Sequence, residues 1–175
     1  MRYFFNRFEN DALNYAYEML ESVTPLRTDC GKLCGGKCCN GDENDGMLLF
    51  PHEKDFFCSS DCFTVKNDPA TGYDEVICNG KCDRKERPLA CRIFPFFFFA
   101  SKQNDGSVKL GVLPDTRARG VCPILNRNEP VSKEFERKMR MIAAVFEKDS
   151  DICDFLIDVT NIITDFGAFS GKDPI

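Results

Sequence analysis

Apolar residues recur at helical spacing near the start of the chain. Residues 10–23 begin with Asn10 or Asp11 as a cap, and Pro25 follows just past the end, so we expect a helix over this range. The apolar positions that would form its buried face are Leu13, Ala16, Tyr17 and Leu20. This helix would pack one side against a core and leave the other in water.

The same spacing recurs twice near the end of the chain. Residues 131–167 predict a helical hairpin in which Ser132 caps the first helix, Asp151 caps the second and Gly167 ends it. The two apolar stripes are Phe135, Met139, Ile142 and Phe146, then Ile152, Phe155, Leu156, Val159, Ile162, Ile163 and Phe166. We interpret this hairpin as a scaffold that packs on a sheet.

Strand patterns lie between these helical regions. Residues 47–50 predict a short buried strand, and residues 73–77 predict another strand. Between them, Pro51-His52-Glu53 predicts the start of a helix, with Glu53 near its positive end. Five phenylalanines lie between residues 94 and 99, which predicts a fully buried central strand. The turn at 104–106 and residues 107–113 would supply its hairpin partner.

The cysteine content is the unusual feature of the composition. A chain of 175 residues with 43% hydrophobic residues can build a core without disulfides, and an odd count of eleven cysteines excludes complete internal pairing. The N-terminus shows no secretory signal, and there is no apolar run of about 18 residues, so we expect a cytoplasmic protein without a membrane span. Clustered thiols that stay reduced are normally metal ligands.

The charge pattern is acidic overall and basic near the cysteines. A net charge of −5 and a pI near 5.0 argue against a general nucleic-acid binder. Two interpretations remain for the cations: a solvated surface, or side chains that offset the negative charge of thiolates around a metal. The cations concerned are Lys32, Lys37, Lys81, Arg84, Lys85, Arg87 and Arg92.

The densest group of sulfurs is the stretch Cys30-Gly-Lys-Leu-Cys34-Gly-Gly-Lys-Cys38-Cys39. Thiolates are soft ligands suited to zinc or iron–sulfur centres, and the glycines allow tight turns whose N–H groups can hydrogen-bond sulfur. This pattern indicates a metal-binding loop, and a redox or disulfide role is the alternative. Cys38 and Cys39 would serve one centre or divide between two.

Three further motifs accompany this loop: residues 46–51, the segment from Cys82 through Arg87-Pro88 to Cys91-Arg92 and Pro95, and Cys122-Pro123. Together with the loop, these motifs resemble the YkgJ-like cysteine-cluster family of zinc- or iron-chelating proteins. The matching motifs span about residues 30–125. The resemblance implies a set of eight metal ligands: Cys30, Cys34, Cys38, Cys39, Cys78, Cys82, Cys91 and Cys122.

These observations predict one α+β domain over residues 1–175, with a small central antiparallel sheet, irregular cysteine-rich metal-binding loops and flanking helices. Its cofactor would be zinc in closed four-thiolate sites, which favours a structural or interaction module of bacterial type. The alternative is an iron–sulfur protein that transfers electrons or supports a redox or group-transfer enzyme. No catalytic residue is assigned, the metal ion is the partner expected, and no protein partner is identified.

Several residues outside the ligand set also have alternative interpretations. His52 is a ligand, a general base or part of a helix start, and Cys58 and Cys62 at i and i+4 of one helix are ligands, a redox pair or packing residues. Cys153 is expected to be a small core residue. Arg87 and Arg92 would donate to sulfur or to a backbone carbonyl, or bind an anion.

Overall fold

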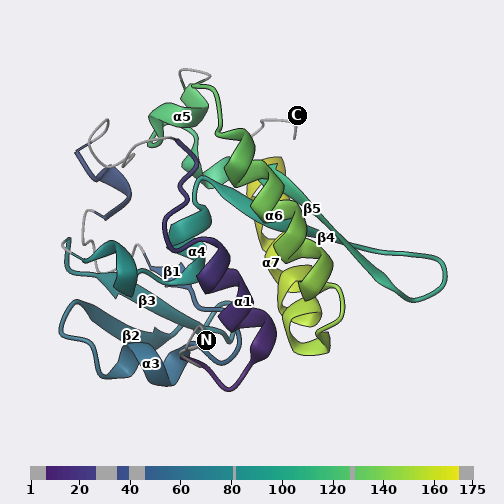
Figure 1. Cartoon of the computed structure of the whole chain (residues 1–175), viewed down its shortest axis with the longest axis horizontal. Coiled ribbons are helices and arrows are strands. Elements are labelled where there is room, and N and C mark those ends of the chain that lie inside the picture. Colours follow the sequence, from purple (N-terminus) through teal and green to yellow (C-terminus); the bar gives the residue numbers. More distant parts are fainter. Residues whose placement is uncertain (1–6, 27–34, 40–45, 81, 127–128, 170–175) are drawn as a thin grey trace, which may run out of the picture.

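The structure is a computed structural model that describes residues 7–26, 35–39, 46–80, 82–126 and 129–169, with the side chains of 39 and 166–169 left out. It contains helices and two small antiparallel sheets, which confirms the α+β class (Figure 1). Cys30 and Cys34 lie outside the described residues, as do Lys32 and Lys81.

The first sheet has three strands in the order β1-β3-β2. Its strands are β1 (Met47–Leu48), β2 (Phe63–Asn67) and β3 (Asp74–Cys78), with β3 in the middle. Val76 of β3 pairs with Met47 on one side and with Val65 on the other, and its side chain is buried. The predicted strand over 73–77 is confirmed with a shift of one residue, and β2 was not anticipated.

The second sheet has two strands, β4 (Phe96–Lys102) and β5 (Val108–Pro114), joined at a turn where Gly106 has a φ of 84°. The hairpin predicted around residues 104–106 is therefore confirmed. The prediction of a fully buried central strand is wrong: among the described residues, β4 pairs only with β5, and Phe96 and Phe99 are half-buried. The tip of this hairpin projects beyond the helices that flank it (Figure 1).

Three long helices form the rest of the scaffold: α1 (Asp11–Met19), α6 (Lys133–Phe146) and α7 (Ser150–Phe169). In α1 the side chain of Asn10 accepts a hydrogen bond from the N–H of Leu13, as a cap should. Ser132 occupies the cap position of α6 but its side chain makes no capping bond. α6 packs on β5, and α7 packs on β4.

Two predicted details of α7 are wrong. Its capping side chain is Asp149 rather than Asp151, because Oδ1 of Asp149 accepts the N–H of Ile152 at 3.0 Å. The helix also continues through Gly167, because a glycine inside a helix lowers its stability without ending it.

Shorter helical turns connect these elements. They are η1 (Lys37–Cys39), α3 (Lys54–Cys58), η2 (Arg84–Glu86), α4 (Leu89–Ile93), η3 (Thr116–Ala118) and α5 (Pro123–Asn126). The predicted i and i+4 placement of Cys58 and Cys62 on one helix is wrong, because α3 ends at Cys58. Cys62 instead lies in the turn that leads into β2.

The core divides into one large and two small apolar clusters. Phe50 joins the two halves of the large one: its ring centre lies 5.8 Å from that of Phe146 in α6 and 5.0 Å from that of Phe155 in α7. The two small clusters lie beside cysteines, one around Ile124 and one around Phe57. Among the described residues, no helix is long and apolar enough to cross a membrane.

Candidate metal centre

The structure places the predicted ligands at several points of the fold. Cys38 is exposed in η1, and the side chain of Cys39 lies outside the description. Cys78 ends β3, Cys82 follows four residues later, Cys91 lies within α4 and Cys122 precedes α5. Within the described part of the chain, no three His, Cys, Asp or Glu side chains converge closely enough to hold a metal ion as they stand.

Cys78 and Cys82 lie on either side of a bend at Gly80. Gly80 adopts a φ of 88°, a left-handed conformation that favours glycine. The backbone N–H of Asn79 donates to the carbonyl of Cys62 at 3.2 Å, and Nδ2 of Asn79 donates to the carbonyl of Asp61 at 3.0 Å. The turn is thus fixed to the segment before β2.

Cys62 belongs to the same neighbourhood. Its side chain packs with Cys78 and Cys82 against the apolar cluster of Leu49, Phe57, Phe63 and Val76. The Cys62 thiol hydrogen-bonds to the Glu86 carboxylate; burial, then this carboxylate and the two nearby sulfurs, raise the pKa of the thiol. The sequence did not predict that Cys62 lies beside Cys78 and Cys82, because its spacing from Cys58 placed it on a helix. The signal was available in the turn at 67–72, since a hairpin there brings Cys62 beside Asn79.

Cys122 and Cys91 lie in other surroundings. Cys122 is buried with Leu26, Ala118 and Ile124, and its N–H donates to the carbonyl of Ala118 at 2.9 Å. Cys91 is half-buried on α4. Cys122 thus belongs to one small apolar cluster, and Cys78 packs against the other.

The arginines near these cysteines bond to backbone carbonyls. Arg92 is buried, and it donates from Nε to the carbonyl of Arg87 at 2.8 Å and from Nη2 to that of Lys85 at 2.7 Å. Arg84 donates from Nη2 to the carbonyl of Val23 at 2.7 Å. For Arg92, the structure thus selects the backbone carbonyl among the predicted alternatives. The bond from Arg84 holds the segment between Cys82 and Cys91 against the chain that follows α1, and the bonds from Arg92 hold this segment together.

Glu53 directly precedes α3, at the helix start that the sequence predicts, and its carboxylate is buried. Its side chain is 0% exposed. Oε1 accepts hydrogen bonds from the hydroxyl of Tyr17 and from the N–H of Leu89 at 2.9 Å, and Oε2 accepts the N–H of Phe50 at 2.7 Å. Burial raises the pKa of Glu53, and these hydrogen bonds partly offset the shift. No local sequence pattern signals such a role, because two of its three partners, Tyr17 and Leu89, lie 36 residues away along the chain.

The remaining predicted residues are His52, Cys58 and Cys153. His52, with a φ of 71°, is exposed, and its Nε2 lies 3.5 Å from Oδ2 of Asp151. Cys58 is exposed at the end of α3. Cys153 is a buried core residue as predicted, and its thiol lies 3.3 Å from the carbonyl oxygen of Phe146.

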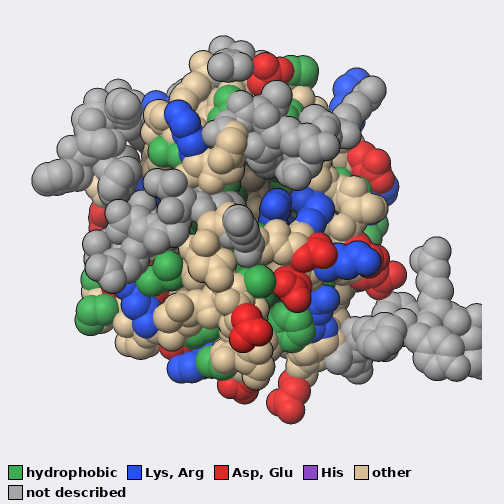
Figure 2. All heavy atoms as spheres, turned by 90° about the vertical axis from the view of Figure 1, so that its left-hand side faces the viewer, with side chains coloured by type: hydrophobic (Ala, Val, Ile, Leu, Met, Phe, Trp, Pro, Cys, Tyr) green, Lys and Arg blue, Asp and Glu red, His purple; other side chains and the backbone are tan. Residues whose placement is uncertain are grey.

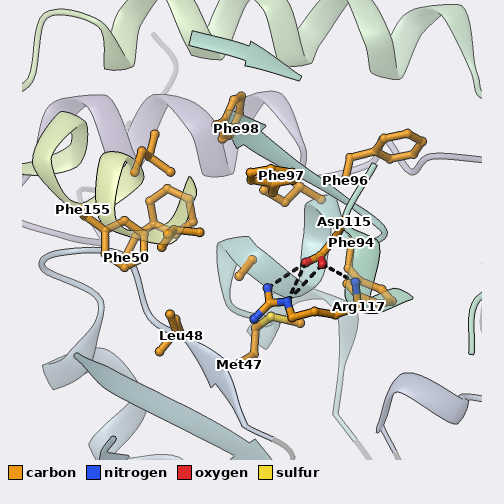
Figure 3. Close-up of a pocket in the computed structure, with 14 residues that line it drawn as sticks. Met47, Leu48, Phe50, Phe94, Phe96, Phe97, Phe98, Asp115, Arg117 and Phe155 are labelled. Atoms are coloured by element: carbon orange, nitrogen blue, oxygen red, sulfur yellow. Dashed lines mark hydrogen bonds and ion pairs between the residues drawn. The ribbon is translucent and has the colours of Figure 1, made fainter. Parts of the chain in front are cut away.

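A small apolar cavity lies between β4, α4 and α7 (Figure 3). Its volume is about 30 Å³, enough for a water molecule or two and too small for an organic substrate. Phenylalanine side chains make up much of its wall, and the charged pair in that wall is satisfied internally: Nη2 of Arg117 lies 2.7 Å from Oδ2 of Asp115.

The described surface on the side of the first sheet carries both signs of charge. Lys and Arg side chains are interspersed there with Asp and Glu (Figure 2). This face has no uniformly basic patch among the residues described, in keeping with the net charge of −5. Comparison of the chain with protein-family models, with curated proteins and with solved structures gives no match.

Proposed function

We propose that this protein binds metal ions through cysteine thiolates, with zinc as the ion, and serves as a structural or interaction module in the cytoplasm. The observation that carries the proposal is the pair Cys78 and Cys82, placed at and just after the end of a paired strand with a bend at Gly80 between them. Short cysteine-to-cysteine turns of this kind present two sulfurs to one ion.

The surroundings of the turn support a structural role. Cys78 lies on the central strand of its sheet, opposite Phe63 of β2, and Asn79 is bonded to the segment before β2. A metal ion at the turn would therefore link β3 to the chain that continues into η2. Zinc suits such a task because it binds four thiolates in a closed tetrahedral site and has no redox chemistry.

Metal analysis tests the proposal directly. The full-length protein is purified anaerobically, its zinc, iron and sulfide are measured, and its absorbance spectrum is recorded. We expect a colourless protein that contains zinc and melts at a lower temperature after a chelator removes it, because metal binding is coupled to folding. A brown protein with iron and sulfide would replace the zinc proposal with an iron–sulfur one, and a protein without bound metal would overturn both.

A pair of cysteine variants localises the metal. Cys82→Ser is expected to lower the zinc content and the melting temperature, because serine is a poor zinc ligand. Cys153→Ser is the matched control, since Cys153 is buried among the residues of α7 and contacts the carbonyl oxygen of Phe146. The ligand assignment is wrong if the two variants keep the same zinc content.

A further inference from the structure

The outer edge of β5 carries a row of backbone N–H groups that point away from β4. The N–H of Gln103 donates to the carbonyl of Ser107 at 2.8 Å, and the N–H of Asp115 donates to the carbonyl of Pro95 at 2.8 Å. Hydrogen-bonded and non-hydrogen-bonded pairs alternate along an antiparallel ladder, so every second residue between these bonds has its N–H directed outward. In β5 these residues are Val108, Leu110 and Val112, followed by Pro114, which has no N–H.

Side chains at the two long C-terminal helices cap both edges of the hairpin at the same level. The N–H of Ala100 in β4 donates to Oγ1 of Thr160 in α7 at 2.9 Å, and this bond is buried. The N–H of Leu110, the residue paired with Ala100, donates to Oε1 of Glu147 at 3.0 Å. Each bond uses a backbone donor that a further strand would need for pairing.

Glu147 is fixed at the edge of β5. It directly follows α6, and its N–H donates to the carbonyl of Ala143 at 2.9 Å. Its second carboxylate oxygen, Oε2, lies 3.0 Å from Nζ of Lys109. Both oxygens therefore have partners in β5, which holds the side chain across the strand edge. Among the residues that the structure describes, no other side chain accepts a hydrogen bond from the outward N–H groups of β5.

We propose that Glu147 prevents a second copy of this chain from adding its own β5 strand to this edge. An uncovered strand edge is a template for pairing with another strand, and proteins protect such edges with charged side chains and proline. Here Glu147 covers the N–H of Leu110, Lys109 is exposed beside it, and Pro114 has no donor to offer. This inference is independent of metal binding.

A second copy is the partner because the edge of β5 is complementary to itself. Val108 and Val112 lie two residues on either side of Leu110, so the outward groups are symmetric about Leu110. In an antiparallel pair of β5 strands with Leu110 opposite Leu110, each outward N–H of one copy meets an outward carbonyl of the other. Such a contact uses the same surface on both copies and closes as a two-fold dimer. Its central donor is the N–H that Glu147 occupies.

Sedimentation velocity of the full-length protein and its variants tests the proposal. Glu147→Ala removes the cap, and we expect it to dimerise at protein concentrations about tenfold lower than wild type requires. Glu147→Gln keeps a side-chain oxygen that can accept the N–H of Leu110, so it should sediment as wild type does. A folded Glu147→Ala protein with wild-type self-association overturns the proposal.

Glu136→Ala is the matched control for charge. Glu136 is exposed on α6, so its substitution removes the same negative charge from the same helix without touching β5. We expect it to sediment as wild type does. If Glu136→Ala or Glu147→Gln dimerises as readily as Glu147→Ala, the effect comes from net charge and the proposed cap is wrong.

Amide hydrogen exchange, resolved by residue, tests the cap in the unmodified protein. In dilute wild-type protein we expect the amide of Leu110 to exchange about tenfold more slowly than those of Val108 and Val112, because Glu147 accepts its hydrogen bond. In concentrated Glu147→Ala protein, all three amides should become protected together. Equal exchange of the three amides in dilute wild type overturns the proposal, as does a Glu147→Ala dimer that leaves them unprotected.

Discussion

The hydroxyl of Tyr17 donates a hydrogen bond to Oε1 of Glu53, and neither side chain is more than 6% exposed. The same oxygen accepts the N–H of Leu89, so one carboxylate joins α1, the turn before α3 and the start of α4. The guanidinium of Arg92 lies 4.5 Å from the centre of the Tyr17 ring and adds a cation–π contact. This buried polar group fixes the segment that carries Cys82 and Cys91.

Tyr17→Phe should destabilise the fold. The variant keeps the ring and its contact with Arg92, but it removes a donor from a carboxylate that has no access to water. We expect the free energy of unfolding to fall by about 1–3 kcal/mol, the cost of leaving a buried acceptor short of a partner. Urea denaturation of both proteins at neutral pH measures this difference.

Tyr15→Phe is the control for that change. Tyr15 is half-buried on the same helix, and its hydroxyl makes no hydrogen bond to the residues that the structure describes. Its loss should alter the free energy of unfolding by no more than about 0.5 kcal/mol. Equal effects from the two variants would show that Glu53 does not depend on the Tyr17 hydroxyl.

The stability contributed by Glu53 should depend on pH. Burial raises the pKa of Glu53 above its ordinary value of 4.5, so the folded state holds the proton to higher pH than the unfolded state does. The contribution is therefore fully present below pH 4.5 and is lost as the pH rises through the raised pKa. Glu53→Gln cannot titrate, so the stability of wild type relative to this variant should decline over that window.

Urea denaturation at a series of pH values measures this decline. Other carboxyl groups titrate in both proteins, so their effects cancel in the difference between wild type and Glu53→Gln. A difference that grows with pH would mean that the hydrogen bonds outweigh burial and lower the pKa of Glu53.

Arg92→Lys should also destabilise the fold, although it keeps the charge. The guanidinium donates from two nitrogens to the carbonyls of Arg87 and Lys85, and a single ammonium cannot reproduce this fork or stack on Tyr17 in the same way. We expect a loss of about 1–3 kcal/mol from the weakened hydrogen bonds of this charged group, measured by denaturation. Arg140→Lys, at an exposed position of α6, should be neutral, and similar losses in both variants would argue against the buried fork.

The helices could be predicted from the sequence because each depends on residues three or four apart. Met139 and Phe146 of α6 are buried as their spacing predicts, and Asn10 caps α1 as its position predicts. Such patterns are local and need no knowledge of the fold.

The buried carboxylate could not be predicted, because burial of Glu53 depends on Tyr17 and Leu89, each 36 residues away. The prediction that Cys62 lies on a helix with Cys58 was wrong for a related reason. The spacing between the two cysteines suits a helix, but α3 ends at Cys58 and the chain turns into β2. Among the candidate ligands, the bend between Cys78 and Cys82 could be predicted from Gly80. The position of Cys62 beside them could not, because it depends on the pairing of β2 with β3.

The phenylalanine run offers a direct test of how β4 is covered. Phe98 is fully buried, 5.3 Å from the ring centre of Phe146, whereas Phe99 is half-buried on the other face of the strand. Phe98→Ala should lower the free energy of unfolding by about 3–5 kcal/mol, because it removes a packed ring and leaves a cavity. Phe99→Ala should cost less than about half as much, since part of its ring already contacts water. Denaturation of the two variants compares them, and equal losses would indicate a strand covered on both faces, as the apolar run alone predicts.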